Sequence, residues 1–366
     1  MAPPAGKWVK LKPMDKPLRK GWTTGACAAA AAKAAWTALA TGDFPDPVDI
    51  VLPRGETPSF PLARHDRGEG WARAAVVKDA GDDPDVTHGA IIEVTVARGN
   101  PGSGLVFRAG EGVGTVTLPG LPLSVGEAAI NPGPRAQIEA NLRAVSGGGP
   151  LDLTITVAIP GGELLAAGTM NGRLGILGGL SILGTTGVVI PYSCAAWINA
   201  IHRGVDVARA TGLSHVAGCT GKTSEAEVRR LHGLDERAMI DMGGFVGALL
   251  KYLRGHPLPR LTLGGGFAKM AKLAAGASDL HSKATPVDPA WLIGLAAELG
   301  AEGDLLARLE RESSAARILE LAGNELPLAA TVAARARESA LAVLAGDVAV
   351  DVAVFDRSGR LIGHAG

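Results

Sequence analysis

A short stretch in the second half of the chain, HVAGCTGKTSE at residues 215–225, decides the fold of that half. Its first four residues, His215–Gly218, are expected to form a strand. A glycine-containing turn follows, and a helix is expected from Ser224 onward. Strand, turn and helix in direct succession are the unit from which layered α/β domains are built.

The sequence after Pro191 continues in this pattern. Further strands are expected at residues 260–263 and 348–355. Helices are expected at residues 195–211, 243–253, 268–275, 291–299, 305–321 and 328–344. Alternating strands and helices predict an α/β domain with a largely parallel sheet, which we assign to residues 191–366.

The turn at residues 218–225 resembles a phosphate-binding loop, but only in part. A Walker A loop needs a glycine five residues before Gly221, and Val216 occupies that position. The dinucleotide pattern GxGxxG is also absent from this turn. The free N–H groups at the start of the helix are able to bind a carboxylate or another anion. An anion site and an ordinary turn between strand and helix both stay open.

The first half of the chain has a different pattern. Thr23 is expected to cap an alanine-rich helix, Ala26 to Ala40, that ends near Gly42. Short β-branched runs follow at residues 49–52, 74–78, 91–96, 114–118 and 153–157. A second helix is expected after Pro132, with Ile138, Leu142 and Val145 on its apolar face. We therefore predict that residues 1–190 form a sheet-rich α+β domain.

The segment Thr169–Gly187 is unusually rich in glycine, and no charged residue occurs between Arg173 and His202. Close glycines let the backbone approach a ligand, and Ser181, Thr185 and Thr186 supply hydroxyl groups. A tightly packed crossover is the alternative. The glycines interrupt any apolar run of about 20 residues, so we expect buried core rather than a membrane span.

A second polar segment, Lys78–Gly89, carries four aspartates and His88 in a turn between two expected strands. Crowded carboxylates bind cations, or raise one another's pKa so that one acts as a base. The alternative is a turn whose aspartates cap nearby backbone N–H groups, and the spacing favours it. A third interpretation is that these aspartates form ion pairs with basic side chains elsewhere in the chain.

Composition limits the partners of the chain. The 36 basic and 36 acidic residues give a formal net charge of zero, so binding to nucleic acid or to an anionic membrane is not expected. The three cysteines, at positions 27, 194 and 219, form no CxxC motif and no zinc cluster. The basic amino-terminal segment (Lys7, Lys10, Lys12, Lys16) precedes no leucine-rich leader. We expect a soluble cytoplasmic protein with no metal site of its own, and assembly into a homo-oligomer stays open.

Four long motifs occur in the order of one known family. They are LRKGWTTGACAAAAAK at residues 18–33, the turn at residues 79–89, NPGPR at residues 131–135 and the segment at residues 169–187. In this respect the chain resembles the cobalt-precorrin-5B C(1)-methyltransferases, with departures at Ala26, Ala80 and residues 277–281. The resemblance implies an α+β amino-terminal domain joined to a Rossmann-like carboxyl-terminal domain. It implies methylation of ring carbon 1 of cobalt-precorrin-5B by S-adenosylmethionine, giving cobalt-precorrin-6A, in cobalamin (vitamin B12) biosynthesis.

That reading assigns hypothetical roles to particular residues. The tetrapyrrole carries several carboxylates, which need basic side chains or helix N-termini as partners. We expect this substrate shell from Arg19, Thr23, Thr24, Lys33, Arg135 and Arg173. We expect the methyl donor to bind in a cleft between domains, at Gly178, Gly179, Thr185, Thr186, Gly218, Thr220, Gly221, Gly264 and Gly265. Asp82, Asp83 and His88 are the candidates for orienting the substrate or removing a proton.

Three other functions compete with this one. A non-catalytic tetrapyrrole-binding protein would share the substrate shell but need no donor site. The same methylation on a metal-free precorrin is the second alternative, because any cobalt is expected to arrive within the substrate. A nucleotide-dependent kinase or ligase is disfavoured by Val216.

Overall fold

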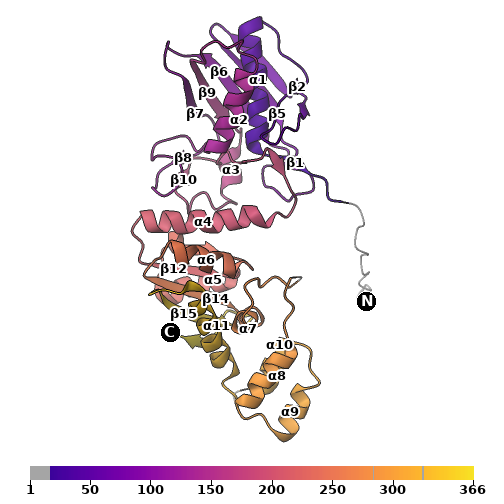
Figure 1. Cartoon of the computed structure of the whole chain (residues 1–366), viewed down its shortest axis with the longest axis vertical. Coiled ribbons are helices and arrows are strands. Elements are labelled where there is room, and N and C mark those ends of the chain that lie inside the picture. The colour runs from indigo at the N-terminus through magenta and orange to yellow at the C-terminus, as the bar shows by residue number, and fades with distance from the viewer. Residues whose placement is uncertain (1–16, 283, 324) are drawn as a thin grey trace, which may run out of the picture. The chain divides into compact units, whose positions relative to one another are not determined.

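The structure is a computed structural model that describes residues 17–282, 284–323 and 325–366 (Figure 1). Lys7, Lys10, Lys12 and Lys16 of the basic segment lie outside the described residues. The chain forms two compact units. Unit 1 comprises residues up to Gly114, Ala128–Gly168 and Gly178–Ser193, and unit 2 comprises Thr115–Glu127, Thr169–Leu177 and Cys194–Gly366. Because two short ranges of the first half belong to unit 2, no single cut in the sequence separates the units.

Unit 1 is built on a five-stranded sheet with the order β4-β5-β6-β9-β7. Its strands are β4 (Arg64–Gly68), β5 (Trp71–Val77), β6 (Ile91–Arg98), β7 (Leu105–Ala109) and β9 (Leu153–Ala158). Neighbours are antiparallel except β7 and β9, which run parallel. β5, β6 and β9 fall where the β-branched runs predicted strands. β4 and β7 were not predicted, because RHDRG is polar throughout and LVFRA is short.

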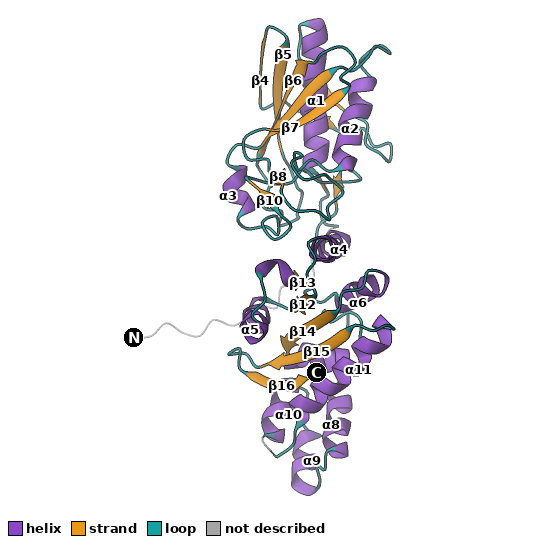
Figure 2. Ribbon diagram, turned by 90° about the vertical axis from the view of Figure 1, so that its left-hand side faces the viewer, coloured by secondary structure: helices purple, strands orange, loops and turns teal. Residues whose placement is uncertain are grey.

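Two helices cover one face of this sheet, α1 (Thr24–Thr41) and α2 (Pro132–Arg143) (Figure 2). α1 begins and ends as predicted, with Thr23 as its N-cap and Gly42 in the left-handed conformation at its C-cap. It packs against α2, β5 and β6, and its alanines from 26 to 35 are fully buried. Small methyl groups permit this close approach on all sides. The prediction for Val145 was wrong, because it lies beyond the end of α2 and is 37% exposed.

Short elements complete the first half of the chain. They are β1 (Gly21–Trp22) paired with β11 (Val188–Val189), β2 (Val48–Asp49) paired with β3 (Ser59–Phe60), α3 (Gly162–Ala166), and, in unit 2, β8 (Thr115–Val116) paired with β10 (Ile176–Leu177). The glycine-rich segment was expected to be buried core, and only part of it is buried. Ile176, Leu180 and Ile182 are buried, whereas Leu177 and Leu183 are more than half exposed. Among the described residues, no helix has the length and apolarity to cross a membrane.

Unit 2 contains a second five-stranded sheet with the order β13-β12-β14-β15-β16. Its strands are β12 (His215–Cys219), β13 (Met239–Asp241), β14 (Arg260–Gly266), β15 (Ala349–Phe355) and β16 (Leu361–Ala365). The first four in this order are parallel, and β16 is antiparallel to β15. The chain passes from β12 to β13 on one side and then to β14 on the other. The order therefore reverses between β12 and β14.

Helices lie on both faces of this sheet (Figure 2). α5 (Lys222–His232) contacts β12 and β14 on one face, while α6 (Val246–Gly255), α7 (Phe267–Ala274) and α11 (Leu328–Leu344) lie on the other. α4 (Cys194–Ala210) packs against α6, and α8 (Pro289–Glu298), α9 (Gly303–Leu309) and α10 (Ala315–Ala322) form a small group beside α7. The single helix predicted at residues 305–321 was wrong. It divides into α9 and α10 around Glu310–Ser314, where Ser314 begins the second helix.

Candidate functional site

The carboxyl ends of β12 and β14 form the place where an open parallel sheet binds ligands, because the strand order reverses between them. β12 ends at Cys219 and leads through Thr220-Gly221 into α5. β14 ends at Gly266 and leads directly into α7. The structure thus brings the two predicted glycine turns of unit 2 side by side: the N–H of Thr220 donates to the carbonyl of Gly264 at 3.0 Å.

The predicted glycines of this edge have different roles. A side chain at Gly218 would meet Leu249 Cδ2 at 2.4 Å, and one at Gly264 would meet Val228 Cγ2 at 2.6 Å. These two glycines permit packing inside the core. At Gly265 an added Cβ would lie 2.9 Å from Thr220 Oγ1, so this glycine lets the two turns approach each other. Gly221 has open space where a Cβ would be, which leaves room for a ligand.

A small cavity of about 150 Å³ opens at this edge, around the beginning of α5. It is lined by Thr220, Gly221, Lys222, Thr223, Ser224, Gly266, Phe355 and Asp356. Its walls come from the ends of three neighbouring strands, β12, β14 and β15, and from α5. Ser224 Oγ donates to the carbonyl of Gly221 at 2.8 Å and so fixes the turn.

Charged side chains that sequence analysis did not select surround the same edge. Asp241 is the last residue of β13, beside Cys219 in the sheet register. Burial and the nearby Glu225 raise the pKa of Asp241. Lys269 on α7 donates to the carbonyl of Thr220 at 2.9 Å, and burial lowers the pKa of its ammonium. Titratable groups with shifted pKa values at a sheet edge are typical of functional sites.

Arg173 also belongs to this group of charges. Its guanidinium donates to Glu225 Oε1 at 2.5 Å and to Glu236 Oε1 at 3.1 Å. All three residues lie in unit 2, because the segment Thr169–Leu177 belongs to that unit. Together with Asp241 and Lys269 they place three carboxylates and two cations near the ends of the strands. Arg173 therefore holds the glycine-rich segment to α5.

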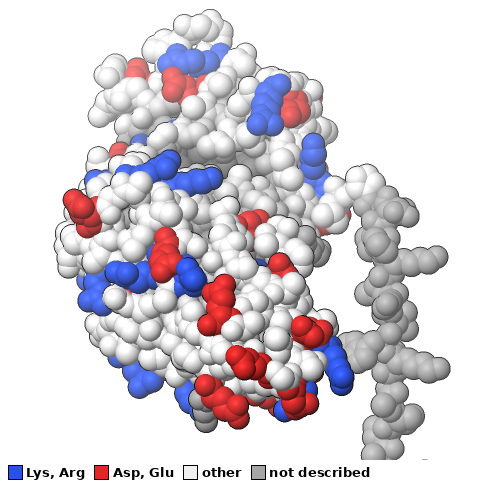
Figure 3. Space-filling model, turned by 60° about the horizontal axis from the view of Figure 1, so that its bottom comes forward, with Lys and Arg blue, Asp and Glu red and all other residues white. Residues whose placement is uncertain are grey.

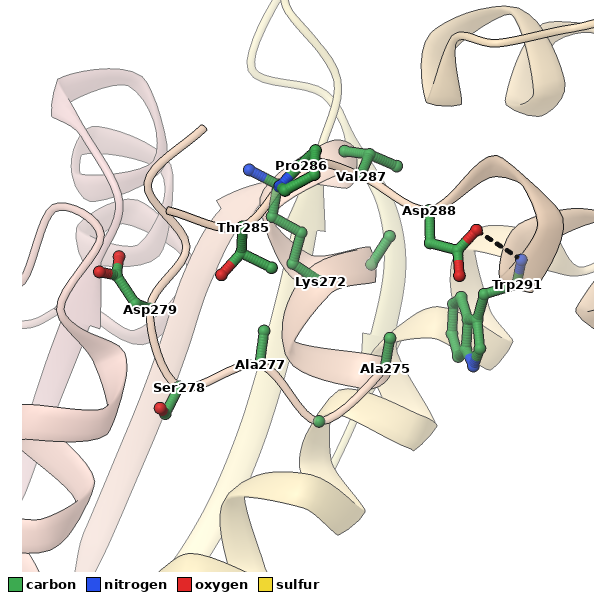
Figure 4. A pocket seen from close by; sticks show the side chains of 12 residues that line it. Lys272, Ala275, Ala277, Ser278, Asp279, Thr285, Pro286, Val287, Asp288 and Trp291 are labelled. Atoms are coloured by element: carbon green, nitrogen blue, oxygen red, sulfur yellow. Dashed lines mark hydrogen bonds between the residues drawn. The ribbon is translucent and has the colours of Figure 1, made fainter. Parts of the chain in front are cut away.

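A larger cavity of about 510 Å³ lies in unit 2 at the far end of α7 (Figure 4). Its polar groups serve the loop that surrounds it. Lys272 donates to the carbonyl of Leu280 at 3.0 Å, and Asp288 caps α8 through the N–H of Trp291. The cavity begins at Ala271, after α7 has left the ends of the strands, so it is distinct from the edge described above.

In unit 1, the acidic turn is tied to the backbone. Asp79 forms a two-pronged pair with Arg19, and Asp82 Oδ2 accepts the N–H of Arg19 at 2.6 Å. Asp83 Oδ1 accepts the N–H of Tyr192 at 2.8 Å, and His88 Nδ1 accepts the N–H of Ala80 at 3.1 Å. The Arg19 guanidinium lowers the pKa of Asp79 to about 2. Each predicted catalytic side chain thus has a structural hydrogen bond, but Asp82 and Asp83 accept from residues 63 and 109 positions away rather than from the turn itself. The pair of Asp79 with Arg19 is the ion pairing with a distant basic group that the third alternative expected.

Lys78, at the start of the same segment, is 2% exposed and pairs with Asp85 and Thr87. The backbone beside it is equally crowded. A Cβ at Gly81 would lie 2.2 Å from the carbonyl oxygen of Arg19. The turn and the strand β1 therefore pack backbone against backbone.

The entrance of α1 is closed by a loop in the last part of the glycine-rich segment. Thr23 and Thr24 are 7% and 4% exposed. Thr23 Oγ1 accepts the N–H of Ala26 at 3.2 Å, and the N–H of Gly25 donates to the carbonyl of Leu183 at 3.2 Å. The carbonyl of Leu183 thus accepts an N–H group that a helix N-terminus otherwise offers to an anion. Within it, Thr186 is half-buried and bonds to the backbone of Val188.

The remaining predicted site residues of unit 1 differ in their surroundings, and the two basic ones, Lys33 and Arg135, have protein partners. Lys33 Nζ donates to the carbonyl of Asp49 at 2.7 Å. Arg135 donates to the carbonyl of Ile130 at 2.7 Å and lies over the Phe107 ring at 5.3 Å. Thr185 is exposed. Gly178 has open space at its Cβ position, whereas Gly179 packs on the backbone of Gly112.

One face of the molecule is mixed in charge. On the face of the molecule in Figure 3, acidic and basic side chains lie next to one another rather than in a patch of one sign. This distribution agrees with the formal net charge of zero.

The chain is a mixed α and β protein, and the parallel strands of unit 2 end at a candidate ligand-binding edge. Comparison with known proteins identifies the family. Residues 11–191 match the model of the CbiD family, and residues 279–366 match that of the CbiD carboxyl-terminal domain. The chain belongs to the CbiD family.

Relatives of high identity extend over nearly the whole chain. A protein of Paramagnetospirillum magneticum named cobalt-precorrin-5B C(1)-methyltransferase is 59% identical over 354 residues, covering 96% of this chain and 99% of its own. A protein of Rhodospirillum rubrum with the same name is 58% identical over 351 residues, covering 95% and 98%. A crystal structure of the cobalamin biosynthesis protein cbiD from Archaeoglobus fulgidus is 29% identical, with a TM-score of 0.39, covering 73% of this chain and 83% of that one.

Proposed function

We propose that this chain transfers a methyl group from S-adenosylmethionine to ring carbon 1 of cobalt-precorrin-5B, giving cobalt-precorrin-6A in cobalamin biosynthesis. The observation that carries this proposal is the identity of 59% to a cobalt-precorrin-5B C(1)-methyltransferase over 96% of the chain. The donor supplies a sulfonium methyl group. The S–CH₃ bond breaks as the ring carbon contributes an electron pair to the new C–C bond, and S-adenosylhomocysteine leaves as a neutral thioether.

We place the donor at the carboxyl edge of the unit 2 sheet. The strand order β13-β12-β14-β15 supports a Rossmann-like description of residues 191–366, and the match to the CbiD model ends at residue 191. Gly221, Gly265 and Thr220 line or shape the turns there. Gly218 and Gly264 support the site through packing. Gly178, Gly179, Thr185 and Thr186 belong to unit 1, and their role in donor binding stays a prediction.

The charges at this edge suit a cationic ligand. With Lys222 and Asp356, which line the cavity, the carboxylates of Glu225, Glu236, Asp241 and Asp356 outnumber the cations of Arg173, Lys222 and Lys269 by four to three. A sulfonium is attracted by such a group, whereas the phosphates of a nucleotide are repelled. This balance favours the methyl donor over the substrate of a kinase or ligase.

For the tetrapyrrole carboxylates, we propose Arg19, Lys33 and Arg135 of unit 1, with Thr23 and Thr24 supporting the entrance of α1. Arg173 lies in unit 2 and pairs with Glu225 and Glu236, so its part in substrate binding stays a prediction. Arg135 is the best candidate, because its guanidinium lies on Phe107 and is oriented by backbone carbonyls. A guanidinium held in this way is well suited to bind a carboxylate. Asp82, Asp83 and His88 position the turn beside Arg19, which is the role that their hydrogen bonds support.

Calorimetric titration tests the donor first. S-adenosylmethionine and S-adenosylhomocysteine should each bind saturably to the purified chain. Transfer of a radiolabelled methyl group to cobalt-precorrin-5B should then follow, with the metal-free precorrin as a parallel substrate. Binding of the tetrapyrrole without any donor binding or transfer would contradict the proposal and support a non-catalytic binding protein.

A matched pair of variants tests the substrate shell. Arg135→Ala should weaken tetrapyrrole affinity by about tenfold or more while leaving S-adenosylhomocysteine affinity unchanged. Arg143 lies on the same helix, is exposed and pairs only locally with Glu139, so Arg143→Ala is the control. Equal tetrapyrrole affinity in the two variants would remove Arg135 from the shell.

A further inference from the structure

Asp241 occupies a particular position in the unit 2 sheet. It is the last residue of β13 and stands directly beside Cys219, the last residue of β12. It also follows Gly221 by 20 residues in the sequence. In βαβ folds that bind dinucleotides, an acidic residue about 20 residues after the glycine turn, at the end of the second strand, accepts hydrogen bonds from a ribose. The spacing here is the same, and the second strand, β13, again lies beside the first, β12. The order of the parallel strands is 2-1-3-4 rather than 3-2-1-4, and the turn lacks the GxGxxG pattern.

The carboxylate of Asp241 has few donors for its degree of burial. Among the described residues, the donor that the structure places at this side chain is the N–H of Gly243. The nearby cations have other acceptors: Arg173 donates to Glu225 and Glu236, and Lys269 donates to the carbonyl of Thr220. The carboxylate is half-buried and each of its oxygens has two lone pairs, so it can accept further hydrogen bonds. Two hydroxyl groups would supply what is missing.

Nearby residues keep this carboxylate in place. The indole N–H of Trp197 donates to the backbone carbonyl of Asp241 at 2.8 Å, and the Trp197 ring lies against the position of a Cβ at Gly243. The N–H of Met242 donates to the carbonyl of Cys219 at 3.2 Å, which joins the ends of β13 and β12. The side chain therefore projects from a rigid point at the same edge as Thr220 and Gly221.

We propose that Asp241 binds the vicinal ribose hydroxyl groups of the methyl donor. The inference rests on the proposed function, and it adds the residue that recognises the adenosine part of the donor. The vicinal diol donates two hydrogen bonds to the two carboxylate oxygens. Glu225 faces Arg173 instead, so the two acids have separate roles: Glu225 anchors the glycine-rich segment, and Asp241 accepts the ligand.

Calorimetry with sugar-modified ligands tests this assignment on the unaltered chain. S-adenosylhomocysteine is compared with its 2′-deoxy and 3′-deoxy analogues. A site built to hydrogen-bond a hydroxyl discriminates strongly against the ligand that lacks it, so each deoxy analogue should bind about tenfold or more weakly. Equal affinity for the three ligands would overturn the inference while leaving donor binding itself intact. No binding of S-adenosylhomocysteine would instead contradict the proposed function.

Substitution completes the test. Asp241→Asn should weaken S-adenosylhomocysteine binding by about the same factor as loss of a hydroxyl group. It should leave affinity for the deoxy analogues nearly unchanged, because the two changes remove the same interaction. Asp235→Asn is the control, since Asp235 is exposed and pairs with Arg237 in the loop before β13. A loss of affinity in Asp241→Asn that is equal for all three ligands would show that the residue acts only on the fold.

Discussion

Arg173 and Glu225 form a two-pronged ion pair, with distances of 3.1 Å and 2.5 Å from the two terminal guanidinium nitrogens to the two carboxylate oxygens. The residues are 52 positions apart, and their side chains are 21% and 14% exposed. The pair joins the glycine-rich segment to the first turn of α5. It fixes that segment beside the edge at which we place the methyl donor.

Arg173→Ala should lower the free energy of unfolding by about 2 kcal/mol, because it leaves the carboxylate of Glu225 without its partner in a partly buried position. Urea denaturation measures this change. The control is Arg230→Ala, whose pair with Glu227 is exposed on the arginine side (80%) and should contribute less than about 0.5 kcal/mol. If Arg173→Ala costs no more than the control, the pair does not hold the segment. The double variant Arg173→Ala with Glu225→Ala should lose less than the sum of the single changes.

The contact between Gly81 and Arg19 predicts a sharp difference between two glycines of one turn. Gly81→Ala should destabilise the chain by about 3 kcal/mol or more, because a Cβ would lie 2.2 Å from a backbone oxygen. Gly89 has the same left-handed conformation but open space, so Gly89→Ala should cost about 1–2 kcal/mol. Thermal and urea unfolding distinguish the two. Equal costs would mean that β1 moves away from the turn easily.

Asp241→Asn should stabilise the chain at neutral pH. The pKa of Asp241 is raised, chiefly by burial and then by Glu225, so the folded state binds a proton more tightly than the unfolded state. The charged carboxylate therefore reduces stability above its folded pKa, and this penalty disappears below the unfolded pKa of about 3.9. The gain in urea stability should be present at pH 7 and absent below about pH 4. A variant that is less stable at pH 7 would indicate that the carboxylate has a structural partner.

His215 should lower the stability of the chain as the pH falls, which is the opposite direction to the effect of Asp241. Its pKa is lowered by burial and by Arg260 and His232, and its Nε2 lies 2.8 Å from the hydroxyl of Thr262. Because the unfolded histidine takes up a proton more readily, its contribution is fully present above about pH 6.5 and decreases as the pH falls below that value. His215→Gln should flatten the decrease of stability between pH 7 and pH 5. The exposed His65→Gln is the control, and an unchanged slope in His215→Gln would contradict the assignment.

Much of the local structure could be predicted from the residues. The threonine cap and alanine run of α1, the proline start of α2 and the strand-turn-helix at residues 215–225 appear where expected. The strands β13 and β16 were missed, because MID has only three residues and LIGHA interrupts its apolar residues with glycine and histidine. The site could be predicted in part. The turns at Thr220-Gly221 and Gly264-Gly265 were selected from their glycines, but Asp241 ends a strand that was not expected.

The sequence by itself determined the family, the order of strands and helices in most places, and the candidate turns, since these depend on residues close together in the chain. Only the tertiary structure decided which of the candidate site residues serve packing and which lie at the edge of the sheet. It buried Thr23 and Thr24, joined Arg173 to Glu225, and assigned Gly218 and Gly264 to packing. It also brought Asp241 beside Cys219. Such pairings depend on which strands become neighbours in the sheet, and burial and charge around a side chain are fixed only when those distant segments meet.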